Sequence, residues 1–508
     1  MLHADWLASR AALTPSRSAV IEVDRGGSRS YRELHEAANR TAHALRSQGI
    51  GEGDRVAVLA RNRVEQIELL FACARLAAVL VPLNWRLAPA ELGPILADCA
   101  PKLVLYDLTS AQLYMAATQH IAVDIADRWG RLSLDDGWAD QVANAPASDL
   151  CAPDLGPDTP WMLLYTSGST GRPKGAILTW GTIGWNAINT VVGWGLSAAD
   201  RTLTGAPLFH TGGWNVFTLP LLYVGGTIYL AEGFDPAQTL DLVQRHHITV
   251  TFGVPTMFQA MRDLPAFATA DLSSLRFAIS GGAPCPAPLN DAWLARGVEF
   301  KQGYGLTEVG PNCFCLPDGA GRTHPGAVGV PMPHLQVRVV DAEDRPVTTG
   351  TVGELQLAGP TVCAGYWRNP EATAGAVTAD GWFRTGDLFS VDRDGFFRCV
   401  GRRKEMFISG GENVYPAEVE RVLGGIDGVA EAAVVPVAHD KWGEVGHAFL
   451  SFRTQATPDA ETVRALCRAQ LAGYKVPRHV TVLPSLPQGA TGKTDKRRLT
   501  EMAAQERA

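Results

Sequence analysis

The 508-residue sequence has few cysteines, no long apolar run and no excess of basic residues. Its nine cysteines are odd in number and thinly spread, which is typical of reduced thiols and does not predict a disulfide framework. The apolar run at Leu76–Leu83 is far shorter than the roughly 20 residues of a membrane span, so we expect no integral membrane segment. The first residues lack the basic stretch and apolar core of a secretory signal, and we predict a cytoplasmic location.

The charge balance is mildly acidic. Lys and Arg together number 45 and Asp and Glu 52, which gives a net charge of −7 and does not favour nucleic acid as a partner. With 46% hydrophobic and 19% charged residues, the composition is that of a folded globular protein and excludes wholesale disorder. At about 150 residues per domain, the length suggests roughly three domain-sized units.

Glycine is abundant, with 52 residues, or about one in ten against an average near 7%. Three glycine clusters follow strands predicted to be buried: Tyr165–Gly175, Ile279–Pro284 and Lys301–Glu308. In an open parallel sheet, ligands bind beyond the carboxyl ends of the strands, and glycine lets the backbone approach a ligand closely. We therefore expect these three loops to form one site.

Apolar periodicity predicts an α/β fold in which helices cover parallel sheets. Predicted strands lie at Val56–Ala60, Val79–Val81, Leu103–Leu105, Trp161–Tyr165, Ile248–Phe252, Leu275–Ile279 and Val298–Phe300, and a helix at Ala90–Cys99. Over residues 326–400, short strands between turns predict antiparallel sheet or a small barrel. A compact α/β unit of about a hundred residues follows Gly401, with predicted helices at Glu418–Leu423 and Thr462–Leu471 and strands at Ala432–Val437 and Val480–Leu483.

The first glycine loop has the composition of a phosphate-binding loop. Its glycines expose backbone N–H groups, Lys174 adds a cation, and hydroxyl donors come from Thr166, Ser167, Ser169 and Thr170. The Walker pattern is met neither here nor at Gly492–Thr494. A surface linker of the same composition is the alternative, but the apolar strand before the loop and the Pro-Lys-Gly after it favour phosphate binding.

Thr166–Gly175 resembles the signature of the AMP-forming adenylating enzymes, a superfamily of acyl-CoA synthetases, nonribosomal adenylation domains and beetle luciferases. Four more segments are similar to family motifs and occur in the family order: Gln302–Glu308 (nucleotide), Trp382–Asp387 (ribose), Gly401–Lys404 (hinge) and Pro487–Lys493 (C-terminal lysine). The resemblance covers nearly the whole chain. It implies a large N-terminal domain of parallel α/β sheets plus a small β-barrel (1–401), a hinge (402–404) and a small mobile α+β domain (405–508).

The resemblance also implies a reaction of the fatty-acid–CoA ligase type. A carboxylate is a poor electrophile because it lacks a good leaving group. Attack on the α-phosphate of ATP makes an acyl adenylate and releases pyrophosphate, and coenzyme A then displaces AMP. Because the first step brings a carboxylate to a polyanion, the site must supply positive charge and oriented donors more than a general base.

Roles for the ATP site follow from the resemblance. Lys174 suits the β- and γ-phosphates, Glu308 with Thr166 would hold Mg²⁺, and Tyr304 would lie against adenine. Asp387 would accept hydrogen bonds from the ribose hydroxyls, and Lys493 would reach the forming acyl–phosphate bond. The full implied set is Thr166, Ser167, Gly168, Ser169, Thr170, Gly171, Lys174, Gly281, Gly282, Ala283, Gln302, Gly303, Tyr304, Gly305, Thr307, Asp387, Arg402 and Lys493.

Each of these residues has a structural alternative. Lys174 could be a solvated surface lysine, and Glu308 a first-turn carboxylate on a helix dipole. Tyr304 could belong to the core. Lys493 belongs to a basic run near the C-terminus, and such runs are usually solvated.

Coenzyme A contacts are implied on the C-terminal domain. Rotation about Lys404 would withdraw Lys493 and bring Gly410 and Gly411 to line a thiol tunnel. For the nucleotide end of coenzyme A, an aromatic face plus a cation suits adenine plus phosphate, and the candidates are Trp442, Tyr474 and Arg478.

The acid pocket is implied at Phe209–Trp214, where His210 would stand as a gate between the acid and coenzyme A; a structural histidine is the alternative. Amino-acid-activating relatives carry an aspartate at this position, so His210 disfavours an α-amino acid. The other predicted lining residues are Trp214, Asn215, Val254, Pro255 and Ala283. Their apolar character favours a fatty or aromatic monocarboxylic acid, and the chain looks closest to fatty-acid and o-succinylbenzoate CoA ligases.

Three alternatives stay open. The chain could be an acyl-AMP ligase that loads a separate carrier protein, an o-succinylbenzoate-type CoA ligase, or a catalytically dead nucleotide sensor. Lys493 lies fifteen positions from the end, too few for a carrier domain of about eighty residues, so we expect free coenzyme A as the acceptor. A homodimer is among the assemblies the sequence allows.

Overall fold

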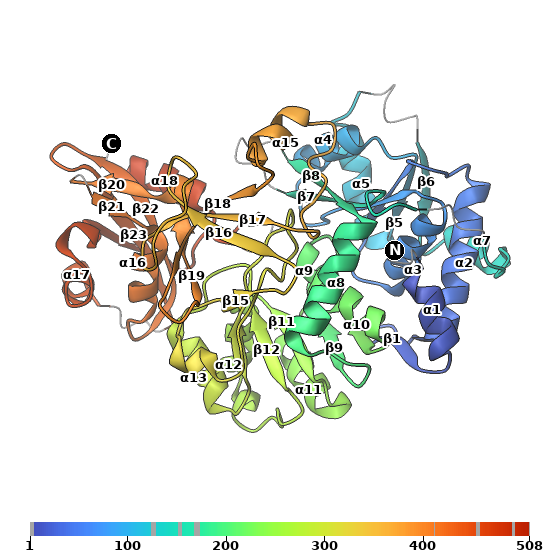
Figure 1. Ribbon diagram of the computed structural model, residues 1–508, viewed down its shortest axis with the longest axis horizontal. Helices are drawn as coiled ribbons and strands as arrows, with labels where there is room; N and C mark the ends of the chain where they lie inside the picture. Colours follow the sequence, from blue (N-terminus) through green and yellow to red (C-terminus); the bar gives the residue numbers. More distant parts are fainter. Residues whose placement is uncertain are drawn as a thin grey trace.

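The computed structural model describes residues 5–122, 129–150, 155–166, 173–410, 412–453, 458–489 and 493–506. It confirms the predicted α/β fold (Figure 1). Two helix-covered sheets, both mainly parallel, make up the first 300 residues, a smaller antiparallel sheet follows, and the strands from Phe407 onward form a separate lobe. Within the described part of the chain, no helix combines the length and apolarity needed to cross a membrane.

The first parallel sheet has the order β6-β5-β3-β4-β7-β8. Only β8 is antiparallel to its neighbour, because it returns directly from β7. Its strands are β3 (Arg55–Leu59), β4 (Val79–Pro82), β5 (Leu103–Tyr106), β6 (Gly130–Ser133), β7 (Pro160–Thr166) and β8 (Lys174–Thr179). Its companion helices are α2 (Tyr31–Ser47), α3 (Val64–Arg75), α4 (Pro89–Cys99), α5 (Ala111–Thr118) and α7 (Trp138–Asn144).

The second sheet has the order β13-β12-β11-β9-β10-β1-β2, parallel except for the edge strand β2. Its strands are β1 (Ser18–Glu22), β2 (Ser28–Ser30), β9 (Arg201–Thr204), β10 (Thr227–Leu230), β11 (Val250–Gly253), β12 (Phe277–Ser280) and β13 (Phe300–Gln302). The remaining helices of this region are α1 (Trp6–Leu13), α8 (Trp180–Trp194), α9 (Thr211–Asn215), α10 (Thr218–Val224), α11 (Pro236–His246), α12 (Pro255–Arg262) and α13 (Ala287–Ala295). Because β12 and β13 are neighbours, the two glycine clusters that follow them emerge side by side.

The predicted antiparallel region is confirmed, but its described strands form an open sheet rather than a closed barrel. The order is β16-β17-β18-β19, and an isolated bridge from Gly329 to Phe397 links its β19 edge to the neighbouring pair β14–β15. The elements are β14 (Phe314–Cys315), α14 (Ala320–Thr323), β15 (Val330–Pro331), β16 (Gln336–Val340), β17 (Gly353–Ala358), α15 (Pro370–Ala376), β18 (Phe383–Val391) and β19 (Phe397–Arg402).

The last lobe has its own sheet, in which β22 and β24 flank β23 and β20–β21 extend it. It comprises β20 (Phe407–Ser409), β21 (Glu412–Val414), α16 (Pro416–Gly424), β22 (Val429–His439), β23 (Gly443–Phe452), α17 (Ala460–Arg468), β24 (His479–Val482) and α18 (Lys496–Gln505). Short 3₁₀ turns lie at Arg403–Glu405 and Gly473–Lys475. Its apolar clusters contain only residues from 407 onward. The domain boundary at 402–404 stays a prediction.

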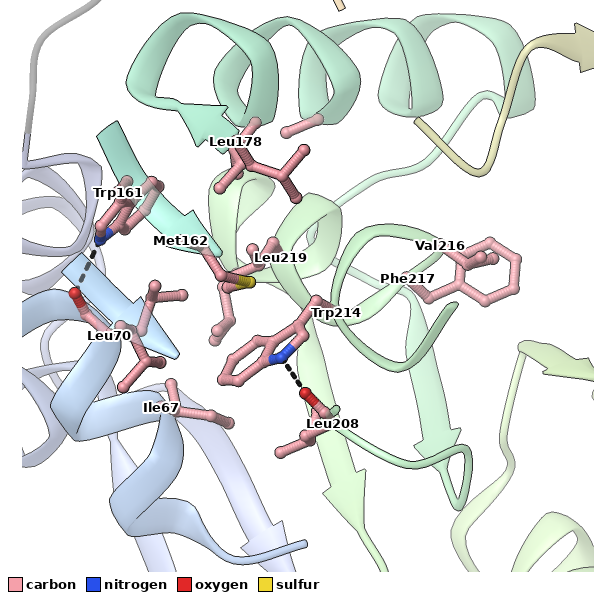
Figure 2. Close-up of a cluster of buried hydrophobic side chains, with 14 of the residues drawn as sticks. Ile67, Leu70, Trp161, Met162, Leu178, Leu208, Trp214, Val216, Phe217 and Leu219 are labelled. Atoms are coloured by element: carbon pink, nitrogen blue, oxygen red, sulfur yellow. Dashed lines mark hydrogen bonds between the residues drawn. The ribbon is translucent and has the colours of Figure 1, made fainter. Parts of the chain in front are cut away.

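The main core lies between the two parallel sheets and is held by buried tryptophans (Figure 2). The Trp161 indole donates a hydrogen bond of 2.7 Å to the Leu70 carbonyl and stacks on Trp180 with ring centroids 3.8 Å apart. The Trp214 indole donates to the Leu208 carbonyl. These two indole N–H groups are therefore paired, whereas the buried Nε1 atoms of Trp6 and Trp194 in the same core have no hydrogen-bond partner among the described residues.

One buried carboxylate is poorly compensated. Glu68 on α3 is 4% exposed, and the Nε of Arg29 lies 3.4 Å from its Oε1. Burial, reinforced by the nearby carboxylates Glu65 and Glu22, raises the pKa of Glu68 from 4.5 to about 7.

We predict that Glu68→Gln stabilises the protein above neutral pH. Because the folded-state pKa of about 7 exceeds the ordinary 4.5, the wild type loses stability as pH rises between these values. The neutral amide removes that loss, so its melting temperature should exceed the wild-type value at about pH 8, by the equivalent of about 3 kcal/mol, and by less than about 1 kcal/mol at about pH 5. Thermal unfolding followed by circular dichroism at both values checks this, and the same difference at both would contradict it.

Candidate active site

The two glycine loops after β12 and β13 are joined by one side chain. The Gln302 amide donates to the carbonyls of Ser280, Ala283 and Gly303 at 3.2, 3.3 and 3.0 Å and accepts from the Cys285 N–H at 2.8 Å. Gln302 therefore orders the backbone of Gly281–Ala283, where the sequence predicted a nucleotide contact.

Two predicted nucleotide glycines are needed by the protein's own packing. A Cβ at Gly303 would lie 2.7 Å from Cγ2 of Ile279, and one at Gly305 would overlap the backbone of Pro311. Gly282 differs, because its φ of +80° is left-handed and a Cβ there would have Val254 at 3.5 Å and Cε of Lys493 at 4.0 Å. Among these three, Gly282 is the one that faces the site.

The first glycine loop connects β7 to β8, so it comes from the other sheet than the two loops after β12 and β13. In the antiparallel pair Thr166 lies opposite Lys174. The predicted phosphate-loop residues Ser167, Gly168, Ser169, Thr170 and Gly171 lie outside the described residues, and so does Gly492. The expected site therefore draws on two sheets instead of one.

Lys174 and Glu308 lie on either side of a residue that the sequence did not predict. The Tyr366 hydroxyl donates to Oε1 of Glu308 at 2.9 Å, and the Lys174 ammonium lies 5.0 Å from the centre of the Tyr366 ring. Burial raises the pKa of Glu308, and the Tyr366 hydrogen bond and the charges of Arg402 and Lys174 oppose that rise.

Asp387 is held from two sides. The Tyr304 hydroxyl donates to its Oδ2 at 2.6 Å, and Nε of Arg402 lies 3.2 Å from its Oδ1. Burial raises the pKa of Asp387, while Arg402 and Tyr304 oppose that rise. The Tyr304 ring packs edge-on against Phe389, with centroids 4.8 Å apart, so part of it belongs to the core, as the alternative foresaw.

Lys493 of the C-terminal lobe lies beside this group. Its pKa is lowered by burial and by Arg402, with Asp387 and Glu405 opposing. The residue keeps solvent exposure, so it covers the site from outside. Lys493 thus lies near Gly282 and interacts electrostatically with Asp387 and Arg402.

His210, the residue that precedes α9, faces Lys493 as well. Its Nε2 is buried and has no hydrogen-bond partner in the described part of the chain. Burial, with help from Lys493 and Arg86, lowers the pKa of His210 to about 4. The ring is therefore neutral near pH 7, and its open nitrogen points to a polar atom of a bound molecule as the missing partner.

Aromatic and apolar side chains form the walls near His210. Phe252 of β11 was not predicted; it is partly exposed, and Cβ atoms at Gly212 and Gly281 would lie 2.8 and 3.1 Å from its ring. Val254 and Pro255, which were predicted, are partly exposed at the start of α12. Glycine at 212 and 281 is what leaves room for the Phe252 ring.

Trp214 and Asn215 lie deeper than predicted. Trp214, which belongs to α9, is fully buried in the cluster of Figure 2, so its indole packs in the core beneath the site segment. Asn215 lines a small cavity of about 10 Å³, room for about one water, together with Thr182, Asn186, Thr211, Thr307 and Thr361. Its Oδ1 has no partner in the described residues.

The predicted coenzyme A residues lie apart from the nucleotide group. The Gly410 N–H donates to the Trp442 carbonyl at 2.9 Å, and a Cβ at Gly410 would lie 2.7 Å from the Trp442 ring. Trp442 and Tyr474 are 40% and 38% exposed, and Arg478 is exposed as well. Gly411 lies outside the described residues.

The hinge region is tied to the antiparallel sheet. Nη1 of Arg403 lies 2.8 Å from Oε2 of the buried Glu354, whose Oε1 accepts from the Gly386 N–H at 3.0 Å. Lys404, the predicted pivot, is exposed in the 3₁₀ turn that follows β19. The consecutive residues Arg402 and Arg403 therefore each pair with a carboxylate of the N-terminal domain.

Comparison with known proteins agrees with this geometry. The AMP-binding enzyme profile matches residues 7–367, and the AMP-binding enzyme C-terminal domain matches residues 418–493. The chain is 42% identical to a feruloyl-CoA synthase of an Amycolatopsis species over 495 residues, 96% of each chain. It is 38% identical to an indoleacetate–CoA ligase of Aromatoleum aromaticum over 506 residues, 98% of each.

The fold is also similar to that of a solved structure over both lobes. The ATP-bound form of MatB from Rhodopseudomonas palustris is 32% identical, with a TM-score of 0.90 over 99% of both chains. The apo form of the same protein gives a TM-score of 0.81 over the same share. Sequence profile, relatives and structure agree over nearly the whole length, and the chain belongs to the AMP-binding enzyme family.

Proposed function

We propose that this protein activates an aromatic carboxylic acid with ATP and transfers the acyl group to coenzyme A. The observation that carries the proposal is the position of Lys493. A lysine from the C-terminal lobe lies between the nucleotide group around Asp387 and the wall at His210. That is where an acid carboxylate and the α-phosphate of ATP would meet.

The adenylation step needs positive charge where two anions approach. The acid oxygen forms a bond to the α-phosphorus while the bond to pyrophosphate breaks. Lys493 offsets the charge at the forming bond, Lys174 attracts the β- and γ-phosphates, and Asp387 with Arg402 holds the ribose. Tyr304 and the Gly281–Ala283 backbone would enclose adenine, with Gln302 keeping that backbone in place.

Glu308 and Thr166 are the residues that would hold Mg²⁺. A partly buried carboxylate and a hydroxyl are hard oxygen donors, and Mg²⁺ takes its other ligands from phosphates and water. In the described residues, no group of three or more His, Cys, Asp or Glu side chains is placed to hold a metal ion. Bound there, the ion would neutralise phosphate charge.

The thioester step uses the other face of the C-terminal lobe. Rotation about Lys404 would withdraw Lys493 and bring Gly410 and Gly411 to the acyl adenylate, with the coenzyme A nucleotide over Trp442, Tyr474 and Arg478. The thiol sulfur bonds to the acyl carbon, the bond to the AMP oxygen breaks, and the thiol proton leaves to solvent. Because it has no side chain, Gly410 already packs closely against the Trp442 ring.

An aromatic acid is favoured over a fatty acid. Feruloyl-CoA synthase and indoleacetate–CoA ligase are named for aromatic acids, and they match this chain over nearly its whole length. Phe252 offers an aromatic surface to the substrate. Because His210 is neutral, neither residue would attract a second carboxylate on the acid. The alternatives to this function are a fatty acid or an o-succinylbenzoate-type acid as the substrate, and a carrier protein as the acceptor. A role in fatty-acid metabolism, a homodimer and a cytoplasmic location stay predictions from the sequence.

An acid panel tests the substrate class. With coenzyme A present, we expect cinnamic- and arylacetic-type acids to give kcat/KM values about fivefold above those of saturated fatty acids of similar length, because one aromatic contact is worth about 1 kcal/mol. The measurement is pyrophosphate release and acyl-CoA formation. A preference for fatty acids would overturn the aromatic assignment, and acyl-AMP without acyl-CoA would favour carrier-protein transfer.

Lys493→Ala should separate the half-reactions. Loss of a charge that acts in the transition state should slow acyl-AMP formation about a hundredfold or more, while thioester formation from supplied acyl-AMP stays within a few fold. Arg497→Ala, an exposed cation in the first turn of α18, is the matched control and should leave both rates near wild type. Equal losses in both half-reactions would contradict the proposed withdrawal of Lys493.

Arg403→Ala should destabilise the orientation of the C-terminal lobe in which adenylation takes place. The substitution leaves buried Glu354 without its cation, so we expect adenylation to fall about three- to tenfold and thioester formation from acyl-AMP to stay unchanged or rise. Arg403→Lys should restore most of the rate, and Arg393→Ala is an exposed arginine control. If Arg403→Ala slowed the thioester step equally, the Arg403–Glu354 pair would not favour the adenylation orientation over the thioester-forming orientation.

A further inference from the structure

Tyr366 stands between two groups of opposite charge that the proposed reaction uses separately. Its hydroxyl donates to Oε1 of Glu308 at 2.9 Å, and its ring centre lies 5.0 Å from the ammonium of Lys174. In the described part of the chain, Lys174 and Glu308 form no ion pair with each other. The single aromatic side chain contacts both groups.

The position of Tyr366 is imposed by its backbone. The segment 363–367 runs antiparallel to β8, the strand that begins with Lys174, through a bridge between Ala176 and Tyr366. The segment's backbone hydrogen bonds are Ala364 N–H to Ile177 O (3.0 Å), Ile177 N–H to Gly365 O (2.9 Å), Trp367 N–H to Gly175 O (2.7 Å) and Cys363 N–H to Glu308 O (2.7 Å). The same short segment therefore holds the strand of Lys174 and the backbone of Glu308.

Without the Tyr366 side chain between them, the Lys174 ammonium and the Glu308 carboxylate would be expected to form an ion pair. A lysine and a glutamate in a partly buried cleft attract each other strongly, and a pair already formed must be broken before either group binds anything else. The Tyr366 ring gives the ammonium a neutral surface that attracts it weakly. The hydroxyl fills one acceptor position of the carboxylate and leaves its other positions open.

We propose that Tyr366 is a positioning residue that keeps Lys174 and Glu308 apart, so that Lys174 stays available to phosphate oxygens and Glu308 to a divalent cation. The inference rests on the roles proposed above for these two residues. It assigns separate parts to the halves of the tyrosine, because the hydroxyl acts on Glu308 and the ring on Lys174.

Two substitutions separate these parts. Tyr366→Phe keeps the ring and removes the hydrogen bond, whereas Tyr366→Leu removes both. Tyr31→Phe is the control, because it also removes a buried hydroxyl, one that donates to the Gly226 carbonyl far from Glu308 in the fold. Binding of ATP is measured by titration calorimetry without any acid, so no turnover occurs, once with excess MgCl₂ and once with EDTA.

For Tyr366→Phe we expect the Kd of ATP to rise about tenfold with MgCl₂ and to stay within about twofold with EDTA. Tyr366→Leu should weaken binding in both conditions, because Lys174 is then free to pair with Glu308. Both variants should form thioester from supplied acyl-AMP at near wild-type rates, and Tyr31→Phe should match wild type throughout. Should Tyr366→Leu fail to fold, the phenylalanine variant alone decides.

Tyr366→Phe with wild-type dependence on MgCl₂ would overturn the inference, as would equal weakening with MgCl₂ and EDTA. Glu308→Gln, measured in parallel, distinguishes failure of the proposed metal role of Glu308 from failure of the positioning role of Tyr366. If Glu308→Gln removes the MgCl₂ effect and Tyr366→Phe does not, the proposed metal role stands and the inference fails. If Glu308→Gln leaves the MgCl₂ effect intact, the metal role itself is wrong and the inference falls with it.

Discussion

The arrangement of the site depends on one carboxylate. Asp387 on β18 receives the Tyr304 hydroxyl from the loop after β13 and the Arg402 guanidinium from the end of β19. One buried side chain thus connects the second parallel sheet, the antiparallel sheet and the hinge. A buried carboxylate is costly unless it is paired, so the three elements are held in the register that pairs it.

The local parts of this design could be predicted from the sequence. Strand positions followed from runs of apolar residues, and the lysines and carboxylates of the motifs could be named because their neighbours in sequence have a recognisable order. Lys493 is the clearest case, since its immediate surroundings are an ordinary basic run and only the loop before it distinguishes it. The structure places it beside Gly282 and Asp387 all the same.

The parts that could not be predicted come from contacts between distant segments. Tyr366 reaches Glu308 because residues 363–367 pair with β8, and Phe252 reaches Gly212 and Gly281 through sheet packing. Trp214, which the sequence suggested as an acid contact, is fully buried in the core, because an aromatic residue in a site segment can face the core as easily as a ligand. The glycines divide in the same way: Gly303 and Gly305 make room for the protein's own chain, and Gly282 faces the site.

The segment proposed as a hinge offers a way for charge to order the two half-reactions. Arg402 and Arg403 are consecutive, and each pairs with a buried carboxylate, Asp387 and Glu354, which are themselves linked through the Gly386–Asp387 backbone. Rotation of the C-terminal lobe would strain both pairs at once, because neighbouring residues cannot move independently. With the proposed roles of Arg402 and Lys493, ATP would add its own negative charge beside these cations and so favour the arrangement in which they lie in the site. Release of pyrophosphate removes most of that charge, which lowers the cost of rotation at the point in the sequence where coenzyme A must enter.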